Sequence, residues 1–187
     1  KFGFGEKTGL DLPGEVRGDL RRLTPKAPAI AFATASFGQG VAITPIELIN
    51  AVSSIANRGQ LMKPYLNASL EPQVLRTVIR EETAREVSQM MVSAVDKNKI
   101  AKISGYSIAG KTGTAQVPDF KNGGYTQGVI NTYVGFGPVT NPRFVILIKL
   151  DEPAGAPAAA ITVVPAFRDL AQFILNYLNI PPDRLAA

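Results

Sequence analysis

The chain has 187 residues, a formal net charge of +5 and 45% hydrophobic residues, so it is long and apolar enough to bury a core. It contains no cysteine and no histidine, which excludes disulfides, thiolate metal sites, a cysteine nucleophile and a histidine general base. Basic residues are scattered rather than interleaved with aromatic ones, and no apolar stretch approaches the roughly 20 residues of a membrane span. We therefore expect no nucleic-acid binding, no metal or other cofactor, and no transmembrane helix.

The first 29 residues are punctuated by glycine and proline and are expected to form loops. Residues 30–37 are apolar and rich in alanine. The strongest helix signal follows, with Thr44 as N-cap, Pro45 at the first helical position and Glu47 completing a capping box. Gly59 lies where a C-cap belongs, so it should end this helix.

Farther along, residues 62–70 read as extended and residues 74–79 as a short strand. A second helix is expected from about residue 82 to residue 95. Its apolar face would comprise Val87, Met90, Met91 and Ala94.

Three strands are expected at residues 107–117, 130–136 and 143–150, with a turn at residues 137–142. A terminal helix should cover residues 158–178, either kinked or started at Pro165. Its apolar surface would comprise Ala171, Phe173, Ile174, Leu175 and Leu178. Helices segregated from an antiparallel sheet predict the α+β class.

One glycine-rich stretch has two interpretations. Gly105 to Thr112 fits the G-x-x-x-x-G-K-[ST] pattern of a phosphate-binding loop, which a strand should precede and a helix should follow. Here a helix-like segment precedes the pattern, and Gly113 and Pro118 disfavour a helix after it. A nucleotide site is therefore the weaker interpretation.

In the second interpretation, the same stretch forms a strand that carries the tripeptide K-T-G. Lys111 would supply a fixed positive charge, and the Thr112 hydroxyl could bind a carboxylate. Gly113 would let a substrate backbone lie against the strand, where a backbone N–H could stabilise an oxyanion. The candidate site residues are Lys111, Thr112, Gly113, Thr114, Ala115 and Gln116.

The tripeptide occurs a second time, at Lys7-Thr8-Gly9, where it runs into a loop and is interpreted as structural. Tyr125 and Tyr133 could line a cleft beside the strand, but we interpret them as packing residues.

Several segments, in this order along the chain, resemble class B penicillin-binding proteins, the monofunctional transpeptidases of peptidoglycan. They are residues 3–15 (GFGEKTGLDLPGE), 33–40 (ATASFGQG) with Thr44-Pro45, 109–116 (AGKTGTAQ), 134–138 (VGFGP) and 165–167 (PAF). K-T-G is a known motif of penicillin-binding proteins and serine β-lactamases.

The resemblance implies a reaction and a set of roles. In this family a serine of an S-x-x-K motif attacks the D-Ala-D-Ala end of a stem peptide, or a β-lactam, and an S-x-N motif assists proton transfer. Lys111 would face the S-x-N serine, Thr112 and Thr114 would bind the carboxylate, and the Thr114 N–H would be an oxyanion donor. Ala115 and Gln116 would continue the substrate-binding strand.

The chain departs from the family pattern because it contains neither S-x-x-K nor S-x-N, and Ser107 has its lysine four residues on. We therefore expect residues 1–187 to be the C-terminal portion of a single transpeptidase domain, inactive alone. The implied partners are the N-terminal half of that domain, peptidoglycan stem peptides, β-lactams and a cell-wall synthesis complex. The implied location is the extracytoplasmic face of the bacterial cell membrane. A penicillin-recognising sensor or pseudoenzyme is the alternative, ahead of a nucleotide binder.

Overall fold

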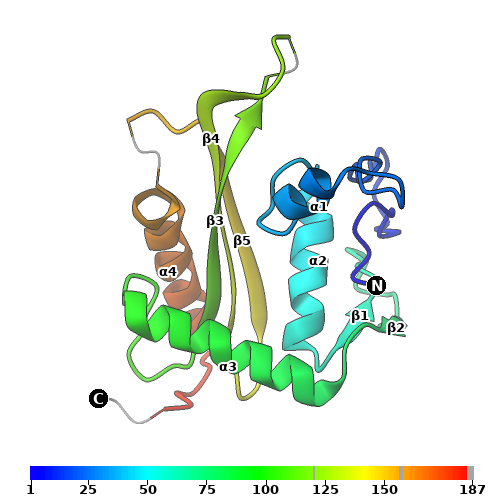
Figure 1. Ribbon diagram of the computed structural model, residues 1–187. Helices are drawn as coiled ribbons and strands as arrows, with labels where there is room; N and C mark the ends of the chain where they lie inside the picture. The colour runs from blue at the N-terminus through cyan, green and yellow to red at the C-terminus, as the bar shows by residue number, and fades with distance from the viewer. Residues whose placement is uncertain (120, 156–157, 185–187) are drawn as a thin grey trace. The chain divides into compact units, whose positions relative to one another are not determined.

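The computed structural model describes residues 1–119, 121–155 and 158–184. The chain divides into two compact units, Lys1–Ala84 and Arg85–Ala187, and its helices and antiparallel sheets confirm the predicted α+β class (Figure 1).

The first unit begins with loops, as the glycine and proline pattern predicts, apart from one bridge between Asp19 and Ala42. Helix α1 (Ala29–Ala35) and helix α2 (Pro45–Ala56) follow. Strands β1 (Gln60–Met62) and β2 (Val74–Thr77) then pair antiparallel.

The predicted start of α2 is confirmed. The backbone N–H of Glu47 donates to Oγ1 of Thr44 at 3.2 Å, and the Thr44 N–H donates to the Glu47 carboxylate at 2.8 Å. These two bonds satisfy amides that the first helical turn leaves without partners.

The predicted end of α2 needs correction, because the C-cap is Asn57 rather than Gly59. Arg58 takes the left-handed conformation with φ of 55°, and the Gly59 N–H then reaches back to the Ser54 carbonyl at 2.7 Å. A Cβ on Gly59 would lie 2.0 Å from the carbonyl oxygen of Ile79, so a close backbone approach requires glycine there.

Helix α3 (Glu81–Asn98) is longer than predicted, and the predicted apolar face is wrong. Met90 is 67% exposed and Ala94 is also exposed, whereas Val87 and Met91 are half-buried. The buried positions follow a different helical stripe, which comprises Ala84, Ser88, Val92 and Val95. Two of these side chains are small, so side-chain hydrophobicity indicated the wrong face.

Strands β3 (Ala109–Pro118), β4 (Tyr125–Gly137) and β5 (Phe144–Asp151) form an antiparallel sheet in the order β3-β4-β5. The three predicted strands are confirmed, although β4 begins five residues earlier than the sequence indicated. Helix α4 (Ala159–Tyr177) packs against all three strands, and the core of this unit lies between them (Figure 1).

Helix α4 starts at Ala159, so Pro165 lies inside it rather than at its start. The expected apolar surface is only partly buried: Ala171 and Leu175 are in the core, whereas Phe173 is 60% exposed and Leu178 is also exposed. Phe173 instead stacks on Tyr177, with ring centroids 5.8 Å apart on the outer face of the helix.

The segment after α4 is fastened to the turn that precedes β3. The Tyr106 hydroxyl donates to the Ile180 carbonyl at 2.8 Å, and the Ser107 N–H donates to the Asp183 carboxylate at 2.7 Å. Arg184 pairs with Asp96 near the end of α3 at 3.0 Å. These contacts fix where β3 begins.

Candidate functional site

The K-T-G tripeptide at Lys111 lies on β3, which pairs with β4 along one side only within the part of the chain that the structure describes. The free edge of an antiparallel strand presents unpaired N–H and C=O groups, to which an extended peptide can add. The K-T-G segment therefore lies at a strand edge that an extended peptide could pair with.

The register of β3 against β4 sorts the candidate side chains onto two faces. Thr112 lies opposite Tyr133 and Thr114 lies opposite Asn131, and both partners are buried beneath α4. Because directly opposed residues share a face, the two threonines lie together on the α4 side. Lys111 alternates to the other face of the sheet.

Lys111 is exposed, and its Nζ donates to the Thr112 carbonyl at 2.8 Å. Among the described residues it forms no ion pair, since no acidic side chain lies within reach of its ammonium group. An unneutralised charge of this kind at a strand edge attracts anionic groups.

Gly113 has a structural reason to be glycine. A Cβ at this position would lie 2.4 Å from Oγ1 of Thr132 on β4, whose hydroxyl donates to the Gly113 carbonyl at 3.4 Å. Beyond it, Ala115 is half-buried and Gln116 is exposed, just before an irregularity in the pairing of β3. The six candidate residues therefore follow one another along a single accessible strand.

The sequence indicates that Tyr133 either packs in the core or lines a cleft beside the strand, and the structure shows the packing. Tyr133 is 3% exposed and packs on Phe167 of α4, with ring centroids 4.6 Å apart. Burial raises the pKa of its phenol well above the usual value, so the group stays protonated. The cross-strand pairing with Thr112 is the signal that could have linked it to the candidate site. Tyr125, the other tyrosine considered, is exposed at the start of β4.

The phosphate-loop interpretation lacks its required geometry. Gly105 lies in a turn, but Gly110 to Thr112 belong to β3, and the strand continues to Pro118. The next helix is α4, which begins at Ala159. No helix N-terminus follows the lysine to bind phosphate.

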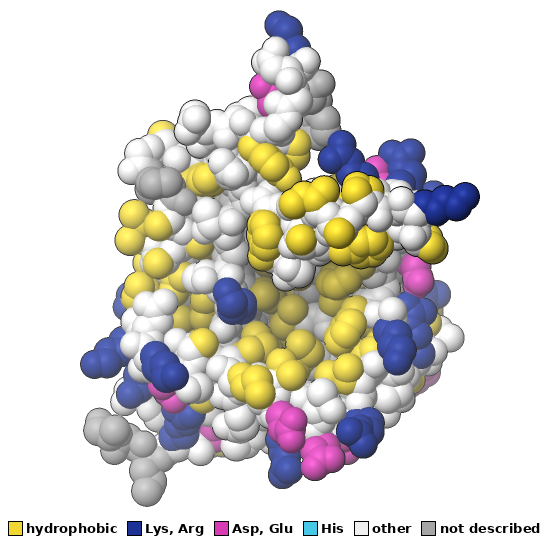
Figure 2. Space-filling view, in the orientation of Figure 1, with side chains coloured by type: hydrophobic (Ala, Val, Ile, Leu, Met, Phe, Trp, Pro, Cys, Tyr) yellow, Lys and Arg dark blue, Asp and Glu magenta, His cyan; other side chains and the backbone are white. Residues whose placement is uncertain are grey.

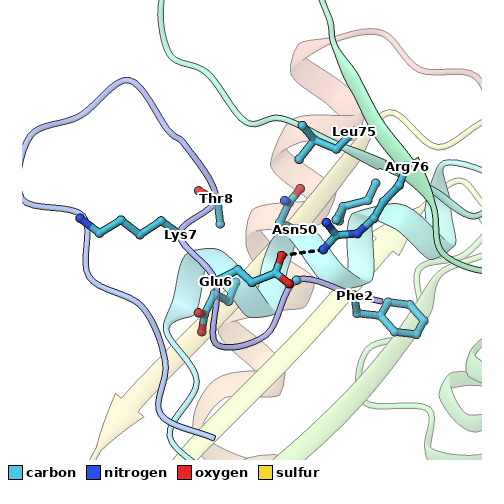
Figure 3. A pocket seen from close by; sticks show the side chains of 10 residues that line it. Phe2, Glu6, Lys7, Thr8, Asn50, Leu75 and Arg76 are labelled. Atoms are coloured by element: carbon cyan, nitrogen blue, oxygen red, sulfur yellow. Dashed lines mark hydrogen bonds and ion pairs between the residues drawn. The ribbon is translucent and has the colours of Figure 1, made fainter.

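The first copy of K-T-G lies in a loop whose conformation is stabilised by hydrogen bonds to Glu15, in keeping with its structural interpretation. Glu15 accepts hydrogen bonds from the N–H and hydroxyl of Thr8 at 2.7 and 2.6 Å, and from the Gly9 N–H at 3.1 Å. Figure 3 shows the Lys7 side chain pointing away from the neighbouring cavity, in which Glu6 and Arg76 pair at 2.8 Å. That cavity has a volume of about 30 Å³, enough for a water molecule.

Ser107, the serine nearest to Lys111 in the sequence, is buried and contacts the Asp183 carboxylate through its hydroxyl. That hydroxyl also accepts a hydrogen bond from the Val139 N–H at 3.0 Å. A serine held in this way is not placed as a nucleophile beside Lys111.

Within the described residues, no three acidic side chains gather closely enough to hold a metal ion. In the same part of the chain, no helix combines the length and the apolar character that crossing a bilayer requires.

Comparison with known proteins adds the family. Residues 1–172 match the model of the penicillin binding protein transpeptidase domain. The chain is 36% identical to stage V sporulation protein D of Bacillus subtilis over 199 aligned residues, which cover 98% of the chain and 30% of that protein. It is 32% identical to a probable peptidoglycan D,D-transpeptidase PenA of Neisseria meningitidis, covering 98% of the chain and 32% of that protein.

Solved structures agree with this result. The transpeptidase domain of Burkholderia pseudomallei penicillin-binding protein 3 superposes with a TM-score of 0.84 at 30% identity, over 98% of this chain and 57% of that one. Penicillin-binding protein 3 of Mycobacterium tuberculosis, solved with ampicillin, gives 0.82 at 30% identity, over 97% of this chain and 45% of that one. The chain thus spans about a third of the length of the curated relatives it matches.

Proposed function

The chain belongs to the penicillin-binding protein transpeptidase domain family, and from this premise we propose that it supplies one wall of a peptidoglycan D,D-transpeptidase active site. The enzyme would cross-link stem peptides through an acyl-enzyme and would be acylated by β-lactams. The observation that carries the proposal is the K-T-G segment that begins at Lys111 and lies on the free edge of β3.

We assign roles along this strand from the motif. Lys111 tunes the charge of the site, Thr112 and Thr114 bind the carboxylate of substrate or drug, and Gly113 allows close approach. The Thr114 N–H serves as an oxyanion donor. Ala115 and Gln116 extend the surface along which the acyl portion lies. The ammonium group of Lys111 is exposed and forms no ion pair with the described acidic side chains, which supports its assignment.

The nucleophile would come from outside this chain. A serine Oγ attacks the carbonyl of the penultimate D-Ala, the bond to the terminal D-Ala breaks, and that residue leaves with its amine protonated. An acceptor amine then attacks the acyl-enzyme and releases the serine. This sequence contains no S-x-x-K, so we propose that residues 1–187 form the C-terminal portion of a single domain and are inactive alone.

An apolar surface in the first unit supports the proposal that the N-terminal half of the domain packs over this chain. Helix α1 has no buried residue, although most of its side chains are apolar. Ile30, Phe32 and Phe37 are all exposed, and Figure 2 shows hydrophobic side chains gathered over this helix. A patch of this kind marks an interaction site. The Burkholderia domain contains much additional chain that this one does not match, which could supply the cover.

By the same analogy, the protein would act in a cell-wall synthesis complex at the extracytoplasmic face of the bacterial membrane. The Neisseria relative is a probable peptidoglycan transpeptidase, which supports this location because peptidoglycan lies outside the cytoplasm.

Labelling with a fluorescent penicillin tests the proposal. The chain is co-expressed with a polypeptide that carries the S-x-x-K portion of the domain, and the purified complex is labelled and separated on a denaturing gel. The label should appear on the partner, and Lys111→Gln should slow its appearance about 100-fold, a loss typical of removing one electrostatic stabiliser. Lys7→Gln, the same change in the other K-T-G copy, should have no effect.

Label on this chain would contradict the assignment of the nucleophile to the partner. A well-formed complex that takes up no label would favour a penicillin-recognising sensor or pseudoenzyme instead.

A further inference from the structure

A second cavity of about 120 Å³ lies beside the start of the K-T-G segment, within the second unit. Its apolar wall includes Val95 near the end of α3, Ala101 in the following turn and Val164 of α4. Lys111 and Thr112 line it from β3. The cavity therefore joins a nonpolar interior to the residues at the edge of the strand.

The Tyr133 side chain also lines this cavity, and it reaches there across β3. A Cβ on Gly110 would lie 1.9 Å from the Tyr133 hydroxyl oxygen and 2.5 Å from Cζ, so the phenol passes directly over the glycine. Gly110 and Tyr133 are not directly paired in the sheet, since Gly110 pairs with Gly135 and Thr112 pairs with Tyr133. The ring thus slants along the sheet toward the beginning of β3, and only a glycine leaves room for it.

The Tyr133 hydroxyl forms no hydrogen bond with another described residue and faces this cavity, while the residue as a whole is 3% exposed. Its ring is held by Phe167, so the hydroxyl cannot turn outward without losing that packing. Tyrosine hydroxyls in protein interiors usually find a hydrogen-bond partner. A molecule that enters the cavity and carries an acceptor can receive a hydrogen bond from this hydroxyl.

We propose that this cavity is a binding site for a compact, uncharged and mostly apolar molecule, about the size of a six-membered ring, that carries one hydrogen-bond acceptor. The volume supports this size, because an apolar protein cavity of roughly 150 Å³ binds benzene. The apolar wall selects an uncharged body, and the Tyr133 hydroxyl selects the acceptor. The site adjoins the proposed carboxylate-binding residues, because Thr112 also lines the cavity, and the inference goes beyond the proposed reaction.

Cyclohexanone is a suitable probe, because it has a six-membered ring and a single carbonyl acceptor. Methylenecyclohexane has nearly the same shape but no acceptor. The full chain, labelled with ¹⁵N, is titrated with each compound, and amide shifts are followed by NMR. Cyclohexanone should cause saturable shifts at Gly110, Lys111 and Thr112 with a millimolar Kd. Methylenecyclohexane should bind about tenfold more weakly.

Tyr133→Phe removes only the hydroxyl and keeps the ring on Phe167, so it should weaken cyclohexanone binding about tenfold and leave methylenecyclohexane unchanged. Tyr125→Phe makes the same chemical change at an exposed tyrosine outside the cavity and should alter neither. Ala94→Leu, an exposed cavity-lining position on α3, should fill the space and abolish binding of both compounds.

Equal affinity of the chain and Tyr133→Phe for cyclohexanone would overturn the proposal, as would shifts that do not saturate or that Ala94→Leu leaves intact. None of these measurements depends on acylation, so the inference can fail while the proposed function stands, and the reverse.

Discussion

The backbone N–H of Gly18 donates a 2.8 Å hydrogen bond to Oε1 of Glu47, although the two residues are 29 positions apart. The same oxygen accepts the Gly5 N–H at 3.1 Å, while Oε2 accepts the Thr44 N–H at 2.8 Å. A single carboxylate, 2% exposed, therefore joins the N-terminal loops to the first turn of α2. A Cβ on Gly18 would lie 2.5 Å from Oε2, so glycine is required for this approach.

Glu47→Ala should consequently be costly. Three amides lose their shared acceptor, and each buried N–H left without a partner costs about 1–3 kcal/mol, so the free energy of unfolding should fall by about 3 kcal/mol or more. Urea unfolding followed by circular dichroism measures the change. Glu86→Ala, at an exposed position on α3, should stay within about 0.5 kcal/mol of the parent. A loss for Glu47→Ala no larger than that of Glu86→Ala would refute the role of this carboxylate.

Gly110→Ala should destabilise the second unit, because the new methyl group would collide with the Tyr133 phenol. Overpacking of this kind typically costs about 1–3 kcal/mol. In a Tyr133→Leu background, which removes the far end of the ring, the same substitution should cost at least about 1 kcal/mol less. A double-mutant cycle by urea unfolding gives this coupling energy. Additive effects of the two substitutions would contradict the contact.

Stability should fall in acid partly through Asp183. Burial by itself raises the pKa of this carboxyl, but hydrogen bonds donated by Ser107 and Thr140 outweigh burial and hold the pKa below its ordinary value of 3.8. The native state therefore binds the proton less tightly than the unfolded state. The stabilisation is present above the unfolded pKa, near 3.9, and is lost as the pH falls through the lower folded pKa.

Urea midpoints measured between about pH 2 and pH 6 check this prediction. Asp183→Asn should reduce the loss of urea midpoint at acidic pH. Asp169→Asn, which changes an exposed aspartate on α4, should give the same dependence of the urea midpoint on pH as the parent. Part of the loss should persist in Asp183→Asn, because other carboxyls also have lowered pKa values. They are Glu6, Asp11, Glu15, Asp19 and Asp119. Parallel curves for Asp183→Asn and the parent would show that this carboxyl does not contribute.

Phe37→Ser should weaken association with the proposed N-terminal half of the domain. Phe37 is 71% exposed beside α1, and burying a phenylalanine contributes about 1.5–3 kcal/mol, which corresponds to a Kd at least tenfold higher in the variant. Phe173→Ser removes an equally apolar side chain from the outer face of α4 and should change the Kd little. Isothermal titration calorimetry distinguishes the two. A Kd that responds only to Phe173→Ser would place the interface on α4.

Local signals predicted much of this fold, whereas contacts between distant residues decided the rest. The capping box at Thr44 and Glu47 is a three-residue pattern, and it was confirmed because its hydrogen bonds lie within one helical turn. The sequence pattern places Gly59 at a helix end. Glycine is also required there because the Ile79 carbonyl approaches its backbone closely, and no local pattern identifies that contact. Met90 was placed in the core because it is hydrophobic, yet Ser88 occupies the buried stripe.

In the candidate site, too, a local pattern predicted one part and a contact between distant residues determined another. The strand from Lys111 to Gln116 was predicted as a strand from its own residues and lies on β3. The role of Tyr133 depends on the register of β4 against β3 and on the room that Gly110 leaves for the phenol, and no local sequence pattern identifies either.

The two outer strands of the sheet differ in how they resist unwanted pairing. Beyond the K-T-G segment, strand β3 ends in Pro118 and has an irregular register, and both features discourage another chain from adding to that part of the edge. Strand β5 begins with the uninterrupted apolar run Phe144 to Ile148, and among the described residues it pairs with β4 alone. Aggregation of the separated chain should therefore begin at β5, and a lysine introduced in place of Val145 should delay it more than any change on β3.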